Sequence, residues 1–218
     1  MYISIGSEGL QKYLCTQLNN FFPDGDIITP ANFSKNWDII IQRTEYCFAQ
    51  VNNKYFHRDS RVFFNHLNGD HYAMFLYFAA NTLYQESQDQ ELASKLFLLN
   101  KYLHAIDAFY EVQLPDIFLF VHPLGTVLGR AKYEDYFVVY QRCNIGSNHD
   151  KYPSLGKHLS MHPGSAVLGD CQLGSNCSLA AGALLMDMDL EDNQVYFGNP
   201  QDYKKKTNSS KLSIWREG

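Results

Sequence analysis

Residues 121–146 (VHPLGTVLGRAKYEDYFVVYQRCNIG) and 155–185 (LGKHLSMHPGSAVLGDCQLGSNCSLAAGALL) carry an apolar residue at every sixth position. The series is Val121, Val127, Tyr133, Val139 and Ile145 and, after a four-residue slip, Leu155, Met161, Val167, Leu173, Leu179 and Leu185. A helix repeats every 3.6 residues and a strand every 2, so neither alone gives a period of six. A solenoid with flat faces does, because each six-residue unit supplies one short strand and one corner.

A small residue follows most of these apolar positions after four residues. These are Gly125, Ala131, Cys143, Ser165, Cys171, Cys177 and Ala183, whereas Phe137 and Leu159 break the rule. We expect the large side chains to fill a triangular coil of about 18 residues per turn, and the small ones to occupy its corners.

The hexads are accompanied by Leu-Gly pairs at 155–156, 168–169 and 173–174 and by the closing FGNP at 197–200. This pattern resembles the hexapeptide-repeat acyltransferases, and over residues 58–206 it is most similar to the serine acetyltransferases. The resemblance implies an acetyl-CoA donor and an α+β fold. We expect an N-terminal all-α helical domain at 1–112, a left-handed parallel β-helix at 113–206 and a loose C-terminal tail at 207–218.

Composition narrows the function classes. The 218 residues have a net charge of −5, so a nucleic-acid surface is not expected. No apolar stretch approaches the roughly 20 residues that span a bilayer, and the N-terminus does not resemble a signal peptide, so we predict a cytoplasmic protein. Five cysteines, an odd number, argue against a disulfide framework. The absence of a Cys-x-x-Cys pair argues against a zinc site.

The first half has apolar residues three and four apart, which predicts helices. We expect them near 10–21, 37–46, 59–67, 70–85 and 87–109, with Ser87 as the N-cap of the last. In serine acetyltransferases such helices join trimers back to back. The resemblance therefore implies a homotrimer or a dimer of trimers.

His122 is the candidate general base. Acetyl transfer from a thioester to a hydroxyl needs a group that takes the hydroxyl proton, and a histidine pKa lies near neutrality. The segment 120–129 (FVHPLGTVLG) resembles the family motif that contains the catalytic histidine, with His122 in that place. We expect His122 at the edge of a face, just after an interior position.

A carboxylate partner would orient this histidine. The family has an Asp fifteen residues before it, in a Val-Asp-Ile-His-Pro run. We match that run to residues 112–115, where Gln113 replaces the Asp and the coil starts one unit later. The nearest carboxylates are then Asp116 and Glu111, and we favour Asp116.

The residues that would bind the acceptor depart from the serine acetyltransferase pattern. Val121 replaces an Asp, and Lys151 with Tyr152 replaces an Arg-His pair, so the grip on a carboxylate is weakened. We still expect His149, Lys151 and Tyr152 to overhang the acceptor pocket. Asp59 resembles the Asp of the Arg-Asp pair that faces the acceptor in the family.

The resemblance also implies a CoA site along a seam between subunits. Gly146 or Ser147, then Pro163 and Ala181, would line it, and Lys204 in the run 204–206 would meet the 3′-phosphate. No metal is expected.

The predicted function is acetyl-CoA-dependent O-acetyl transfer to L-serine or a similar hydroxyl. Two alternatives remain: transfer to a sugar or nucleotide-sugar hydroxyl or amine in surface polysaccharide synthesis, and a non-catalytic hexapeptide scaffold. A β-helix of the γ-carbonic-anhydrase kind is disfavoured, because His122, His149 and His162 do not have the required spacing.

Overall fold

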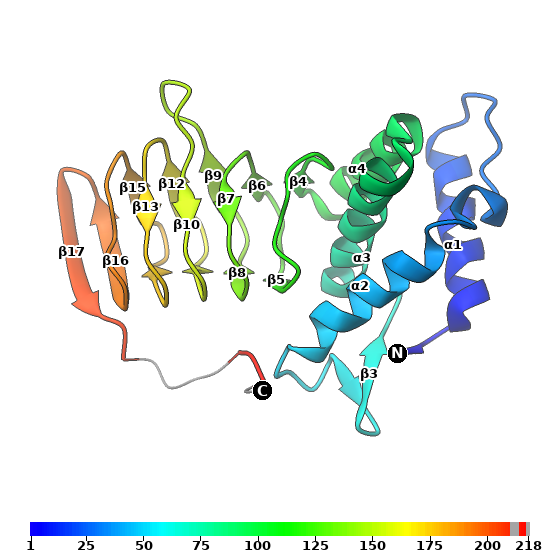
Figure 1. Cartoon of the computed structure of the whole chain (residues 1–218), viewed down its shortest axis with the longest axis horizontal. Coiled ribbons are helices and arrows are strands. Elements are labelled where there is room, and N and C mark those ends of the chain that lie inside the picture. The colour runs from blue at the N-terminus through cyan, green and yellow to red at the C-terminus, as the bar shows by residue number, and fades with distance from the viewer. Residues whose placement is uncertain (210–213, 217–218) are drawn as a thin grey trace. The chain divides into compact units, whose positions relative to one another are not determined.

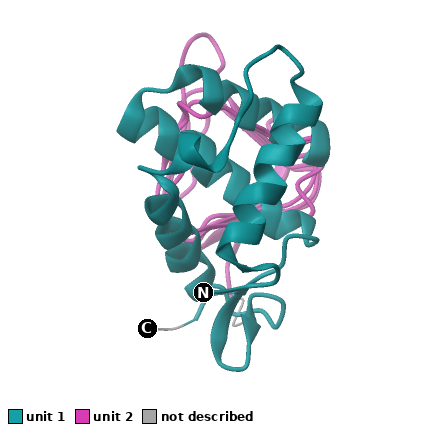
Figure 2. Ribbon diagram, turned by 90° about the vertical axis from the view of Figure 1, so that its right-hand side faces the viewer, with its two compact units in different colours: residues 1–104, 214–218 teal, residues 105–213 magenta. Residues whose placement is uncertain are grey.

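The computed structural model describes residues 1–209 and 214–216. The chain divides into two compact units, which Figure 2 colours differently. The helical unit consists of residues 1–104 together with the chain end from Ile214, and the coil unit consists of residues 105–213. The coil unit therefore begins at Ala105, eight residues before the predicted boundary at 113.

The helical unit is built around α3, whose residues 71–82 are all buried. Its elements are α1 (Gly6–Phe21), η1 (Pro30–Phe33), α2 (Trp37–Ala49), α3 (Gly69–Thr82), η2 (Leu83–Ser87) and α4 (Gln90–His104), with a small sheet of β1 (Tyr2–Ile3), β2 (His57–Arg58) and β3 (Arg61–Phe64). The sequence of α3 is apolar nearly all round, as a helix enclosed by others requires. None of the helices in the described residues is long and apolar enough to cross a bilayer.

Two local predictions in this unit are wrong. The helix expected at 59–67 is the β2–β3 hairpin, because Asp59 and Ser60 take φ angles of 49° and 61° and form a two-residue turn. The N-cap of α4 is Asp89 instead of Ser87, since the Asp89 carboxylate accepts the Leu92 N–H at 3.0 Å.

The coil unit is a prism with three sheet faces (Figure 1). Face A contains β4 (Asp107–Ala108), β6 (Val127–Leu128), β9 (Asn144–Gly146), β12 (Ala166–Leu168) and β15 (Leu184–Met186). Face B contains β7 (Lys132–Tyr133), β10 (Ser154–Leu155) and β13 (Gln172–Leu173). Face C contains β5 (Phe118–Phe120), β8 (Phe137–Val139), β11 (Ser160–Met161), β14 (Ser178–Leu179), β16 (Gln194–Asn199) and the antiparallel β17 (Asp202–Thr207).

From Tyr133 onward the hexad series fills the interior of the prism as predicted. Met161 pairs in parallel with Val139 on one side and with Leu179 on the other, and all three are fully buried. Cys143, Cys171 and Cys177 are buried free thiols at the corners. Repetition of the same interior position in successive coils gives the continuous core expected of a solenoid.

The start of the series departs from the prediction. Val127 is 42% exposed, whereas Leu128 is 1% exposed and pairs with Ile145. Phe120, and not Val121, pairs with Val139 in the interior. The interior positions before Tyr133 therefore do not follow the six-residue grid.

Both ends of the coil also differ from expectation. The first strand is β4, which pairs with β6, so the coil starts at Asp107 and not near Gln113. At the other end, β17 extends to Thr207. Of the tail predicted at 207–218, residues 210–213 and 217–218 lie outside the described residues, whereas Trp215 is buried and bridges Val51 in the helical unit.

Candidate functional site

Four stacked turns form the edge where face C leads into face A, and we call it the His122 edge. Its turns are residues 121–126, 140–143, 162–165 and 180–183. Hydrogen bonds join successive turns, from the N–H of Arg142 to the O of Leu124, from Gly164 to Gln141 and from Gly182 to Pro163, each at 2.9 Å. The edge is thus a ladder of equivalent positions.

The turn that contains His122 is longer than the other three. Six residues, 121–126, join β5 to β6, whereas four residues join each later pair of strands. Hydrogen bonds equate Val121 with Tyr140 and Leu124 with Gln141, so His122 and Pro123 are the added residues. His122 is exposed and has a left-handed φ of 49°. The insertion places His122 at the surface, as predicted, and it also shifts the hexad grid.

Asp107 lies at the base of this same turn. Its N–H donates to the O of Thr126 at 2.9 Å, and the N–H of Gly125 donates to the O of Ala105 at 2.9 Å. Ala108 is buried in the prism, whereas Asp107 is only partly buried and faces outward by strand alternation. Asp107 precedes His122 by fifteen residues. The resemblance implies an Asp fifteen residues before the histidine, so this spacing alone points to Asp107. Matching the family run to residues 112–115 points to Gln113 instead and misses it.

The structure separates Asp116 from His122. Asp116 precedes β5 and His122 follows it, so the two lie at opposite ends of the strand, on different edges of the prism. Next to Asp116, the N–H of Ile117 donates to the carboxylate of Asp135 at 3.1 Å. Within one chain, the fold therefore does not bring Asp116, the carboxylate favoured from the sequence, next to His122.

The loop 147–152 forms a second departure from the coil, on the edge where face A leads into face B (Figure 1). Asn148 and Lys151 form a bridge, and His149 and Asp150 form the tip with φ angles of 47° and 58°. Tyr152 is 42% exposed. Within one chain these residues lie on a different edge from His122.

Two carboxylates hold this loop against the following coils. The Lys151 ammonium lies 2.7 Å from Asp170, which raises the lysine pKa. The Asn148 amide donates to Asp187 at 2.5 Å, and the N–H of Asp170 donates to Asp187 at 2.9 Å. These hydrogen bonds lower the pKa of Asp187, with the bond from the Asp170 backbone first among the causes.

The remaining predicted residues are divided among several places. Pro163 and Ala181 lie on the His122 edge, whereas Gly146 and Ser147 lie at the end of β9 near the loop. Lys204 is exposed on β17. Asp59 is exposed at the tip of the β2–β3 hairpin, in the helical unit.

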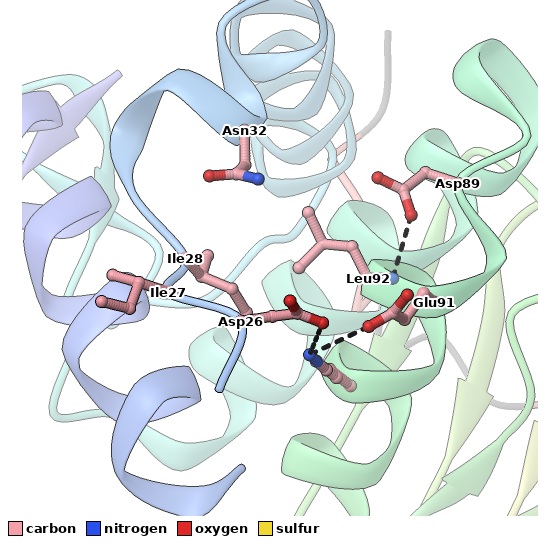
Figure 3. Close-up of a pocket in the computed structure, with 8 residues that line it drawn as sticks. Asp26, Ile27, Ile28, Asn32, Asp89, Glu91 and Leu92 are labelled. Carbon is pink, nitrogen blue, oxygen red and sulfur yellow. Dashed lines mark hydrogen bonds and ion pairs between the residues drawn. The ribbon is translucent and has the colours of Figure 1, made fainter. Parts of the chain in front are cut away.

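A pocket of about 330 Å³ lies in the helical unit, and its lining includes none of these residues (Figure 3). Asp26, Glu91 and Lys95 line it, and the Lys95 ammonium lies 3.2 Å from Glu91 and 2.9 Å from Asp24. The hydrogen bond to Asp24 raises the pKa of Lys95. Because its cation is already paired with carboxylates, we assign the pocket no part in the chemistry.

Comparison with known proteins adds the following. No protein-family model matches the chain. A Schizosaccharomyces pombe protein named "Putative serine acetyltransferase" is 28% identical over 134 residues, which are 59% of this chain and 49% of that protein. The chain thus spans about half the length of the curated relative it matches.

Two solved structures resemble the chain over most of its length. The serine acetyltransferase of Brucella abortus strain S19 superposes with a TM-score of 0.66 at 16% identity, covering 92% of this chain and 83% of that one. A serine acetyltransferase in complex with CoA superposes with a TM-score of 0.68 at 17% identity, covering 91% and 85%. The chain therefore has the fold of the serine acetyltransferases, a helical region followed by a left-handed parallel β-helix.

Proposed function

We propose that this protein transfers an acetyl group from acetyl-CoA to the hydroxyl of L-serine, with His122 as the general base. The observation that carries the proposal is the exposure of His122 on a two-residue insertion, in a chain with the serine acetyltransferase fold. A structural corner would not need the insertion, since the three later turns of the same edge close with four residues.

The chemistry assigned to His122 is proton transfer. The imidazole takes the serine hydroxyl proton while the oxygen attacks the thioester carbonyl carbon. The tetrahedral intermediate then collapses, the carbon–sulfur bond breaks, and the CoA thiolate takes up the proton that His122 held. O-Acetylserine and CoA are the products.

We assign the supporting carboxylate to Asp107, in place of Asp116. Its backbone is bound to the turn of His122, and it stands at the spacing expected from the resemblance. A carboxylate in this position would fix the imidazole tautomer and stabilise the imidazolium formed during attack.

The donor site that we propose needs more than one chain. Pro163 and Ala181 share the His122 edge, whereas Gly146, Ser147 and the loop 147–152 lie on another edge. In a homotrimer, the two edges of neighbouring subunits would meet at one seam. His149 and Tyr152 would then approach the acceptor from the neighbouring subunit, and Lys204 would pair with the 3′-phosphate of CoA. A dimer of trimers, joined through the helical units, is the larger assembly that we consider.

The second candidate acceptor is a sugar hydroxyl, and one observation favours it. Lys151, which stands where serine acetyltransferases have an arginine, is already paired with Asp170. An acceptor without a carboxylate would not need it.

An assay of thiol release separates the two acceptors. The purified chain is incubated with acetyl-CoA and either L-serine or a panel of nucleotide sugars, and free CoA is followed with a thiol reagent. We expect release that depends on serine. CoA release with nucleotide sugars alone would favour the second candidate acceptor. No CoA release with any acceptor, together with no CoA binding by calorimetry, would favour a non-catalytic scaffold.

A further inference from the structure

One position of the His122 edge breaks a glycine pattern. The third residue of each four-residue turn, and its equivalent in the longer turn, has a left-handed φ: 74° at Gly125, 58° at Arg142, 74° at Gly164 and 71° at Gly182. Glycine is the residue that adopts this conformation without steric cost. A side chain kept in such a conformation is a reason to look for a function.

Arg142 stands directly over the turn that contains His122. Its N–H donates to the O of Leu124 at 2.9 Å. A Cβ at Gly125 would lie 3.6 Å from the Cγ of Arg142, so the arginine stem runs beside Gly125. Arg142 and His122 therefore belong to adjacent turns of one edge, in the same chain.

The guanidinium of Arg142 is available to a ligand. Arg142 is exposed, and among residues 1–209 and 214–216 no carboxylate forms an ion pair with it. Lys151 differs from Arg142, because its ammonium forms an ion pair with Asp170 at 2.7 Å. A planar guanidinium matches a carboxylate in two-point fashion, which a lysine ammonium cannot do.

We propose that Arg142 binds the carboxylate of the acceptor while His122 takes its hydroxyl proton. This inference rests on the proposed function and makes the acceptor a small hydroxy acid or hydroxy amino acid. The carboxylate of serine lies only a few bonds from its hydroxyl. Adjacent coils are about 4.8 Å apart. The guanidinium of Arg142, one coil from His122, can therefore reach the carboxylate of a serine whose hydroxyl lies at His122. Arg142 thus supplies the acceptor carboxylate with the positive charge that Lys151, paired with Asp170, does not supply.

The matched test is Arg142→Gly. Glycine occupies the equivalent position in the other three turns, so this variant keeps the backbone conformation and is expected to fold. We expect the KM for serine to rise about 10-fold to 100-fold, as for loss of a charge-assisted contact, with kcat changed less than about twofold. Arg142→Lys should give a smaller rise, because the charge remains and the fork is lost. Arg130→Ala, which removes another exposed arginine of the coil, is the control and should leave the KM unchanged.

Calorimetry with CoA separates this proposal from its premise. An unchanged CoA dissociation constant in Arg142→Gly, together with a raised serine KM, supports acceptor binding. A weakened CoA affinity with an unchanged serine KM would assign Arg142 to the donor and overturn the proposal. So would a wild-type protein that acetylates only hydroxyls lacking a carboxylate. A wild-type protein that binds neither CoA nor serine would instead refute the proposed function itself.

Discussion

Two segments of the coil unit, the turn 121–126 and the loop 147–152, are longer than their counterparts in other coils, and they are built in opposite ways. The turn 121–126 has two extra residues and presents His122 at the surface of an edge. The loop 147–152 is longer, yet Lys151 is held by Asp170 and Asn148 by Asp187, both from later coils. The first departure exposes a titratable side chain, to which we assign proton transfer, whereas the second is fixed in place by carboxylates of later coils. If this distinction is correct, changes in the two places should affect different quantities.

The largest effect is expected from His122→Ala. Loss of a general base should lower kcat by about 100-fold or more. Because His122 is exposed, the melting temperature should change little. His158→Ala is the matched control, since His158 is also exposed, also has a left-handed φ and lies on another edge. A normal kcat in His122→Ala would contradict the proposal that the insertion presents a general base.

The next effect concerns the carboxylate. Asp107→Asn keeps the shape of the side chain and removes its charge, so we expect kcat to fall about 10-fold to 100-fold through the loss of imidazolium stabilisation. Asp116→Asn, at the other end of β5, should leave kcat within about twofold. The opposite ranking of these two variants would restore Asp116 as the partner and would require it to come from a neighbouring subunit.

Much of the coil could be predicted from the sequence, because repetition of one interior position leaves a signal in every turn. From Tyr133 to Leu185 the predicted interior residues are buried. The prediction failed before Tyr133, where the spacing of the interior positions changes. Leu128 and Tyr133 are five residues apart, and the insertion of His122 and Pro123 puts Phe120 and Leu128 eight residues apart. The five-residue spacing makes Val127 look interior, and matching the family run to residues 112–115 hides Asp107. The pairing of Lys151 with Asp170 joins residues nineteen positions apart, and neither spacing nor periodicity reports such a contact.

A smaller effect is expected from the aromatic pair on the His122 edge. Tyr140 and His162 occupy equivalent positions in adjacent turns, and their rings stack with centroids 5.4 Å apart. Burial lowers the pKa of His162, which favours the neutral imidazole in this stack. If the arm of CoA runs along this edge, Tyr140→Leu should raise the KM for acetyl-CoA about 3-fold to 10-fold through lost packing.

The chain offers a control for this prediction. Tyr136 and His158 form a similar stack, with centroids 4.4 Å apart, on the edge where face B leads into face C. Tyr136→Leu removes the same kind of contact at a different edge. An equal change of KM in both variants would show that the effect comes from stability of the coil and not from the donor.

The smallest effect on activity is expected from the loop, and it should depend on pH. Hydrogen bonds from Asp170 and Asn148 lower the pKa of Asp187, so the folded state favours its ionised form. The resulting stability is present above the ordinary pKa of an aspartate, about 3.8, and is lost as pH falls through the lower folded value. Proteolysis at the loop tip should therefore accelerate below pH 4 in the wild type. In Asp187→Asn, cleavage should already be fast at pH 7 and should not depend on pH in this range.

The kinetics of Asp187→Asn at pH 7 then decide how separate the two departures are. An unchanged kcat with a loosened loop would mean that the loop stabilises the coil and takes no part in proton transfer by His122. A KM for serine that rises in step with loop cleavage would mean that the loop reaches the acceptor. Since the loop and His122 lie on different edges of one chain, that result would require the seam between two subunits to be the place where the reaction occurs.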